Sequence, residues 1–323
     1  RHTRSLVPSR GLGDVYKRQD LGCHHCCHDV VRLYAVIRAL VLACICALLG
    51  ACAKPAPEPE PASGEAAERV VAFAPHLSEI MFAIGAGDRL VGVSSWSDYP
   101  REVLDLPEVG DAFTVDQEQL SLLQPDLVLV WESGMPAHTV EELRGRGYRI
   151  EVIRTRSLAD VSAAMITLGE LTGRRAGAME AAEQYTSALE QLAEQYRDAA
   201  PISVFFQVSN RPLYTINREH FISEIISICG GHNVFDDLDD MAPSVSVEAV
   251  LERDPEVMLA GANLGDDAFA EWVRWPGLAA NRYGNQFLLS DETIGRPIPR
   301  LVVAGQAVCI ALDQARRNRA AAQ

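Results

Sequence analysis

Aromatic side chains follow several predicted strands, at positions where a sheet can bind a ligand. Trp96 and Tyr99 lie in the loop that leaves the second predicted strand, and Trp131 directly follows the third. Phe113 lies on the connection between them, and Tyr214 follows the first strand region of the second half of the chain. Because ligands of open parallel sheets bind beyond the carboxyl ends of the strands, these rigid faces predict a cleft for a large, flat, apolar ligand. For Tyr99 and Phe113, packing in the core remains an equal alternative.

Two charged residues could supply polar contacts in the same cleft. Asp291 and Arg296 follow the last predicted strand. Trp272 and Trp275 stand at helical spacing, which instead favours core packing.

Common catalytic motifs are missing from the sequence. It contains no P-loop, no GxGxxG after a strand, no GxSxG and no HExxH. Beyond residue 52 no histidine stands at a ligand spacing from another, so we expect surface or capping roles for His76, His138, His220 and His232. His76, just past the first strand, is the strongest candidate for a further role. We therefore predict a protein that is not an enzyme, with no catalytic residues, no metal site and no cofactor.

The net charge argues against some partners. The 323 residues carry −15, and residues 52–323 alone carry −19, because residues 1–51 hold seven Lys/Arg and three Asp/Glu. Such acidity argues against nucleic acid and against a basic membrane-binding face. The length suits two modest domains.

Apolar runs alternate with helical patterns along most of the chain, which predicts parallel sheets covered by helices. Strands are predicted over residues 69–74, 89–93, 127–130, 149–153, 203–208, 256–260 and 286–289. Helices are predicted over 77–84, 139–146, 157–171, 219–229, 246–253, 268–275 and 299–317, and a short one begins at Asp116.

The longest predicted helix, residues 174–199, separates two series of strands. Its apolar residues recur at spacings of three and four on one face, and glutamates occupy the other. We interpret it as a spine that joins two Rossmann-like α/β lobes, residues 69–173 and 200–323. As the only bridge, it would limit how far the lobes part. An ordinary crossover helix inside one larger sheet is the alternative.

A sequence repeat supports the two-lobe interpretation. Glu118 and Glu248 each stand seven residues before a proline that introduces a strand, Pro125 and Pro255. Each glutamate also follows a capping residue by two positions, so both lie in the first turn of equivalent helices. The helix dipole favours a carboxylate there by about 0.3–1 kcal/mol. This effect alone would explain the presence of either glutamate considered by itself. Their matched placement indicates a paired role.

The first 68 residues do not show the pattern of a folded domain. Residues 1–29 include SLVPSRGLGDVYKRQ, which resembles translated sequencing-adapter sequence, so we treat them as a non-native leader. The Cys/His cluster at residues 23–28 has metal-ligand residue types. We reject it as a metal site because it falls in this suspect segment.

An export signal follows this leader. Residues 30–51 contain an apolar run too short to span a bilayer securely. The run ends in Leu49-Gly-Ala-Cys52, a pattern that resembles a lipobox and predicts lipidation of Cys52. A plain signal peptide is the alternative. Residues 52–68, rich in Pro, Glu and Ala, are predicted to be a tether.

Only two cysteines, Cys229 and Cys309, lie beyond residue 52. In an exported body they suggest a disulfide. Two buried thiols in adjacent helices are the alternative.

From Arg69 to about Asp313 the chain resembles the cobalamin-binding proteins of ABC importers, within the group of siderophore, haem and cobalamin receptors. The resemblance lies in VGVSSWSDYP (91–100), QPDLVLVW (124–131), ICGGHNVF (228–235) and the positions of the two cysteines. It implies two lobes bridged by one long helix, with a cobalamin or related corrinoid held between them.

The resemblance also implies roles for single residues. Corrin contacts fall at Trp96, Trp131, Tyr214, Asp291 and Arg296. The group's permease-docking carboxylates fall at Glu118 and Glu248, and its disulfide at Cys229 and Cys309. There are three departures from the pattern. Phe113 matches a family Trp only after a one-residue shift, and Ala242 replaces another Trp. The loop that begins at Asp291 differs in length, so Arg296 and Arg300 compete for one role.

We therefore expect an exported, lipid-anchored, monomeric binding protein that delivers a corrinoid to the permease subunits of an ABC importer. An iron–siderophore or haem ligand is the nearest alternative. A chelatase-like enzyme on a related fold and a structural surface lipoprotein are the others.

Overall fold

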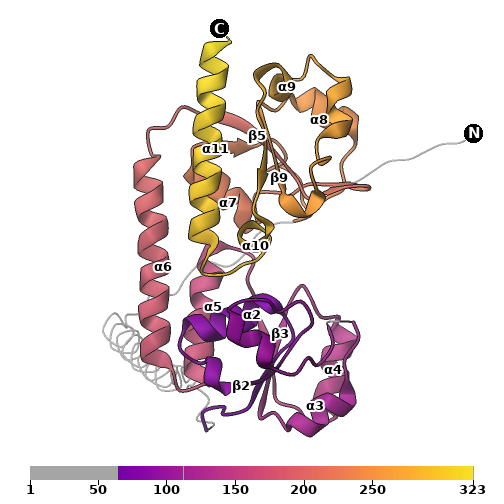
Figure 1. Cartoon of the computed structure of the whole chain (residues 1–323), viewed down its shortest axis with the longest axis vertical. Helices are drawn as coiled ribbons and strands as arrows, with labels where there is room; N and C mark the ends of the chain where they lie inside the picture. Colours follow the sequence, from indigo (N-terminus) through magenta and orange to yellow (C-terminus); the bar gives the residue numbers. More distant parts are fainter. Residues whose placement is uncertain (1–64, 112, 323) are drawn as a thin grey trace, which may run out of the picture. The chain divides into compact units, whose positions relative to one another are not determined.

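The described part of the chain has an α/β fold with two parallel sheets (Figure 1). The computed structural model describes residues 65–111 and 113–322. The predictions for residues 1–29, 30–51 and Cys52 lie outside the described residues, as does most of the predicted tether. Among the described helices, none is long and apolar enough to cross a membrane.

The first sheet has four parallel strands in the order β2-β1-β3-β4. They are β1 (Val70–Ala72), β2 (Leu90–Val93), β3 (Leu127–Trp131) and β4 (Ile150–Ile153). The central strands β1 and β3 consist of apolar residues that are almost all buried, as expected where helices cover both faces. The parallel register aligns the carboxyl ends of all four strands at one edge.

The second sheet repeats this topology. Its parallel strands are β5 (Ile202–Gln207), β8 (Gly231–Asn233), β9 (Val257–Gly261) and β10 (Gln286–Leu289). The order β10-β9-β5-β8 again places the second strand on one side of the first, and the third and fourth on the other. The predicted two-lobe α/β fold with parallel sheets is thus confirmed. The sequence pattern misses β8, because its three residues contain no apolar run and only its pairing with β5 defines it.

Helices cover both sheets. They are α2 (Pro75–Ala83), α3 (Gln117–Leu123), α4 (Ala137–Gly145), α5 (Leu158–Leu171), α6 (Arg175–Gln195), α7 (Phe221–Ile228), α8 (Val247–Arg253), α9 (Ala279–Tyr283), α10 (Asp291–Ile294) and α11 (Leu301–Ala321). The helix predicted over 268–275 forms as a short 3-10 helix, η4 (Ala270–Arg274). Trp272 is buried in this segment, and its indole N–H donates to Gln207 Oε1 at 2.7 Å.

Helix α6 is the predicted spine. Its buried residues are those of the predicted apolar stripe: Ala178, Ala182, Tyr185, Leu189 and Leu192. They pack against α5 and α11 within one hydrophobic cluster that also contains residues of β1 and β5. In Figure 1, α6 runs from the lobe of β2 and β3 to the lobe of β5 and β9. Because one core includes residues of both sheets, the lobes share their packing.

Helix α6 is the single stretch of chain that bridges the lobes, as predicted, and hydrogen bonds between the start of α5 and α7 add a further contact between them. The Phe221 amide at the start of α7 donates to the Arg156 carbonyl at 2.9 Å. One turn on, Glu224 Oε2 accepts from the Leu158 amide at 3.1 Å. These bonds tie the start of α5, in the first lobe, to α7 in the second. Contacts between residues so far apart in the sequence leave no local pattern.

The sequence repeat corresponds to a repeated structural unit. Helices α3 and α8 have seven residues each and precede the central strands β3 and β9. The side chains of Asp116 and Ser246 cap them by accepting from backbone amides. Both helices end on a non-glycine residue in the left-handed conformation, with φ of 44° at Gln124 and 42° at Asp254. Each lobe therefore presents its first-turn glutamate in the same local setting.

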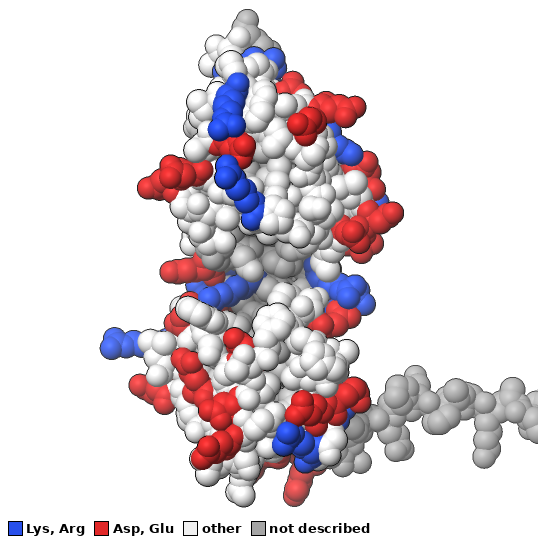
Figure 2. Space-filling model, turned by 90° about the vertical axis from the view of Figure 1, so that its right-hand side faces the viewer, with Lys and Arg blue, Asp and Glu red and all other residues white. Residues whose placement is uncertain are grey.

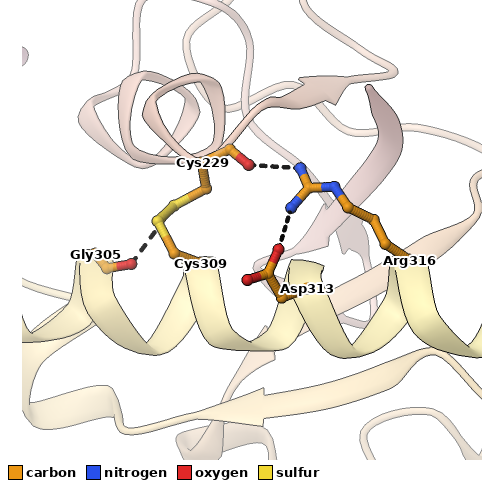
Figure 3. Close-up of a disulfide and its surroundings, with 5 residues drawn as sticks. All are labelled: Cys229, Gly305, Cys309, Asp313 and Arg316. Atoms are coloured by element: carbon orange, nitrogen blue, oxygen red, sulfur yellow. Dashed lines mark hydrogen bonds and ion pairs between the residues drawn. A yellow bond between two sulfur atoms is a disulfide. The ribbon is translucent and has the colours of Figure 1, made fainter. Parts of the chain in front are cut away.

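A disulfide joins Cys229 to Cys309, with Cα atoms 4.8 Å apart (Figure 3). Cys229 follows the last turn of α7, and Cys309 lies within α11. From α11, Arg316 donates to the Cys229 carbonyl at 2.6 Å, and it also pairs with Asp313 at 2.8 Å. The bridge therefore connects two helices inside the second lobe.

Candidate functional site

A cavity of about 420 Å³ opens at the carboxyl end of the first sheet. The residues that line it follow β1, β2 and β3. Between β1 and β3 the strand order reverses, and ligands of open α/β sheets usually bind at such a reversal point. The lining includes Phe73, Pro75, Trp96, Phe113, Trp131 and Gly134. Most of this wall is apolar, and three of its aromatic residues were predicted to bind a ligand.

Two of these aromatic residues are unusually exposed. Trp96 is 79% exposed and Phe113 80%, whereas Trp131 is partly buried. Trp96 also has a φ of 68°, which is uncommon for a bulky residue, and such backbone conformations gather at functional sites. Their exposure excludes core packing for Trp96 and Phe113 and leaves large apolar faces open to a ligand.

Tyr99, by contrast, is not among the residues that line this cavity. The guanidinium of Arg300 lies over its ring, 3.8 Å from the ring centroid. This contact is a cation–π interaction. Tyr99 therefore packs against the second lobe at the rim of the first.

His76 lies behind the aromatic wall. It is buried, its ring meets that of Trp131 edge-on at 5.0 Å, and Thr155 Oγ1 lies 3.5 Å from its Nε2. Burial, together with the positive charge of Arg296, lowers the pKa of His76 to about 3. The predicted surface or capping role is wrong for His76, because the α2 helix carries it into the core. Among the other three, His220 accepts from the Ile222 amide and caps α7.

The second lobe presents a different surface at the carboxyl end of its sheet. A cavity of about 580 Å³ lies between the segments that follow β5 and β9, the equivalent reversal point. Polar and charged groups line much of it: Asn210, Arg211, Asn263, Asp267 and Glu271. Tyr214 lies beside it in a short antiparallel hairpin, β6 (Ser209–Asn210) and β7 (Leu213–Tyr214), and is 37% exposed. The two lobes therefore carry cavities of unlike polarity at matching positions.

Both candidate arginines pair with carboxylates of the first lobe. Arg296 donates to the two carboxylate oxygens of Asp98 at 2.5 and 3.0 Å. Arg300 donates to those of Glu79, both at 2.7 Å. Asp291, the remaining predicted contact, is the first residue of α10. Sequence reasoning misses Asp98 and Glu79, because pairs separated by 198 and 221 residues leave no local signal.

The surface is hollowed between the lobes, and basic side chains lie on both sides of this hollow (Figure 2). Acidic side chains are spread over both lobes in the same view. Among residues 65–111 and 113–322, no group of three or more His, Cys, Asp and Glu residues could hold a metal ion.

Glu118 and Glu248 lie apart from both cavity linings. Each is exposed in the first turn of its helix. Neither has a side-chain hydrogen bond or ion pair among the described residues. Both carboxylates are therefore open to an outside partner.

Comparison with known proteins identifies the family. The model for periplasmic binding proteins matches residues 70–296. This chain belongs to the periplasmic binding protein family. The vitamin B12-binding protein of Vibrio cholerae is 33% identical over 253 residues, which cover 78% of this chain and 91% of that protein. Its counterpart in Vibrio parahaemolyticus is 34% identical over 259 residues, 80% of this chain and 94% of that one.

Solved structures of periplasmic binding proteins agree with this fold. The periplasmic vitamin B12-binding protein of Vibrio cholerae matches with a TM-score of 0.70 at 34% identity, over 77% of this chain and 98% of that one. A periplasmic haem-binding protein from Roseiflexus sp. RS-1 matches with a TM-score of 0.68 at 24% identity, over 77% and 99%. At that identity the second match supports the fold alone.

Proposed function

We propose that this periplasmic binding protein captures vitamin B12 or a related corrinoid between its two lobes. The observation that carries the proposal is the aromatic cavity beyond β1 and β3, with Trp96, Phe113 and Trp131 in its wall. A corrin is a large, flat macrocycle, and exposed aromatic faces bind such a surface by burying apolar area. The Vibrio relatives, which are vitamin B12-binding proteins, support the same ligand.

The polar side of the ligand would face the second lobe. Corrinoids carry amide groups around the ring, and these need hydrogen-bond partners when they leave water. Arg296 and Tyr214 are the residues that we assign to this role, together with Asp291. Binding is non-covalent, and no residue acts as a catalyst.

Delivery to the permease subunits of an ABC importer is the second part of the proposal. Glu118 and Glu248 would dock on the permease, because both are exposed at equivalent points of the repeated unit. Export by residues 30–51, lipidation of Cys52 and a monomeric state complete the proposal. These assignments rest on the sequence pattern and on the resemblance to importer proteins.

Calorimetric titration of the purified protein tests the ligand. We expect saturable binding of cyanocobalamin, with cobinamide as a second corrinoid probe. Trp131→Ala should lower the affinity by about tenfold or more, as the loss of a buried aromatic contact at a binding site typically does. Ile310→Ala is the matched control, because Ile310 is an exposed apolar residue on α11 outside both cavity linings.

Titration with haem and ferric siderophores separates the alternatives. If either binds and cyanocobalamin does not, the corrinoid assignment is wrong and the binding-protein class stands. If none of the four ligands binds, the ligand-binding proposal itself is wrong.

A further inference from the structure

Two arginines of one short segment cross from the second lobe to the first, yet their surroundings differ. Arg296 pairs with Asp98, and Arg300 pairs with Glu79. Both pairs are bidentate, the geometry in which guanidinium–carboxylate bonds are strongest. What distinguishes the two pairs is their burial.

The Arg300–Glu79 pair is shielded from water. The side chain of Glu79 is 4% exposed and that of Arg300 23%. Arg300 also lies over the ring of Tyr99, so it has two partners in the first lobe. Removing one member of a buried pair leaves an uncompensated charge, which is strongly unfavourable. This pair therefore acts as a fixed attachment between the lobes.

The Arg296–Asp98 pair is far more accessible. The Asp98 side chain is 53% exposed and that of Arg296 26%. The hydrogen bonds from Arg296 lower the pKa of Asp98, so the carboxylate is charged at neutral pH. Pairs with this much exposure contribute little net free energy. Exchanging Asp98 for another polar partner of Arg296 therefore costs little free energy.

The exposed pair belongs to the same loop as one wall residue of the aromatic cavity. Asp98 follows Trp96 by two residues in the loop after β2. The charge of Arg296 reaches His76, whose ring packs against Trp131 from behind. Arg296 is therefore bonded to the loop that carries Trp96, and its charge acts on the histidine that packs against Trp131. Arg300 instead donates through Nε and Nη2 to Glu79 and lies over the ring of Tyr99.

We propose that Asp98 competes with the ligand for Arg296, whereas Glu79 holds Arg300 in place whether or not ligand is bound. This inference rests on the proposed function. A corrinoid amide oxygen would accept from Arg296 and leave Asp98 to water. Asp98 is then a residue that sets the affinity without touching the ligand, and Arg296, not Arg300, is the ligand contact.

Cyanocobalamin titrations of Asp98→Asn, Arg296→Gln and the double variant test the competition. We expect Asp98→Asn to bind about two- to fivefold tighter than wild type, since the exposed pair no longer has to be broken. Arg296→Gln should bind about tenfold more weakly or worse, because a charged hydrogen-bond donor is lost. In the double variant, Asp98→Asn should not change the affinity for cyanocobalamin relative to Arg296→Gln alone. Added salt should narrow the difference between wild type and Asp98→Asn.

Three results would overturn the inference. If Asp98→Asn weakens binding as Arg296→Gln does, Asp98 orients Arg296 in the bound state and does not compete. If wild type binds no corrinoid, the proposed function is wrong and this inference falls with it. Thermal unfolding without ligand checks the contrast between the pairs independently: Glu79→Gln should lower the midpoint markedly and Asp98→Asn only slightly. If both variants lowered the unfolding midpoint equally, the proposed difference between the Arg300–Glu79 and Arg296–Asp98 pairs would be wrong.

Discussion

His76 is a single buried residue that makes the stability of the protein depend on pH. It sits behind Trp131 with its ring buried, and burial lowers its pKa to about 3. His220 is only partly exposed to solvent, and desolvation lowers its pKa to about 4. In the unfolded chain both imidazoles return to an ordinary pKa near 6.5. The unfolded state therefore binds protons below about pH 6.5 that the folded state does not.

We expect acid to destabilise the protein through these two histidines. The folded state accommodates only the neutral imidazoles. The stability that the two histidines allow is therefore fully present above about pH 6.5. It is lost as the pH falls from there toward the folded-state pKa values. Each histidine lowers the free energy of unfolding by up to about 1.4 kcal/mol per pH unit in that range. Urea denaturation of His76→Phe between pH 7 and 4 should give a flatter dependence than wild type.

The control for this prediction is His138→Gln, because His138 is exposed on α4. Its pH dependence should run parallel to that of wild type. A His76→Phe curve that is equally parallel would contradict the role of His76.

At this scale the sequence identifies residue types better than residue partners. That Trp96, Phe113 and Trp131 line a cavity could be predicted because cavities of open sheets follow the carboxyl ends of strands, and strands have a local pattern. Tyr99 could not be assigned, since its contact with Arg300 depends on how two distant segments pack. Asp98 and Glu79 were missed for the same reason.

At the scale of helices and strands, the disulfide links the end of α7 to the middle of α11. Both helices contribute to the core that includes residues of both sheets. The bridge spans 80 residues of sequence. Closing a loop of that length removes unfolded-state entropy, and the chain-entropy model puts the stabilisation at roughly 4 kcal/mol.

We expect Cys229→Ala with Cys309→Ala to lower the free energy of unfolding by roughly 2–4 kcal/mol. Guanidinium denaturation with and without a strong reductant measures the change. Reductant should shift the midpoint of wild type toward that of the double variant and leave the double variant unchanged. A wild-type midpoint that stays constant once thiol titration shows full reduction would contradict the prediction.

Elements with local signals could be predicted, and those without could not. Helix α6 with its buried stripe and the central strands follow from periodicity. The start of α5 follows from a capping box, in which the Ser157 side chain accepts from the Asp160 amide and the Asp160 side chain from the Ser157 amide. Strand β8 and the hairpin of β6 and β7 are two or three residues long and exist through pairing alone. The boundaries of the predicted domains remain predictions.

At the scale of the whole molecule, two sheets of the same topology each carry an exposed first-turn glutamate. A paired role for Glu118 and Glu248 requires that docking and ligand binding be separable. The cavity linings contain neither residue, which is consistent with that requirement.

We expect Glu118→Lys with Glu248→Lys to abolish binding to the permease, because both contacts become repulsive toward a basic partner surface. Affinity for cyanocobalamin should stay within about twofold of wild type. Co-purification with the permease and calorimetry measure the two properties separately. Glu180→Lys with Glu190→Lys on α6 makes the same charge change at other exposed positions. Retained docking, or a loss of ligand affinity in the Glu118/Glu248 variant, would contradict the assignment.

The repeated strand order has a consequence for how such a chain can change over time. Each lobe carries a complete parallel sheet with its own reversal of strand order, and each has its own cavity at that point. Substitutions can therefore alter the polar cavity of the second lobe while the aromatic cavity of the first stays intact. In such a duplicated architecture, the lining of one cavity can be changed while the other is kept. One example is to replace the loops after β5 and β9 by those of a relative that binds another ligand.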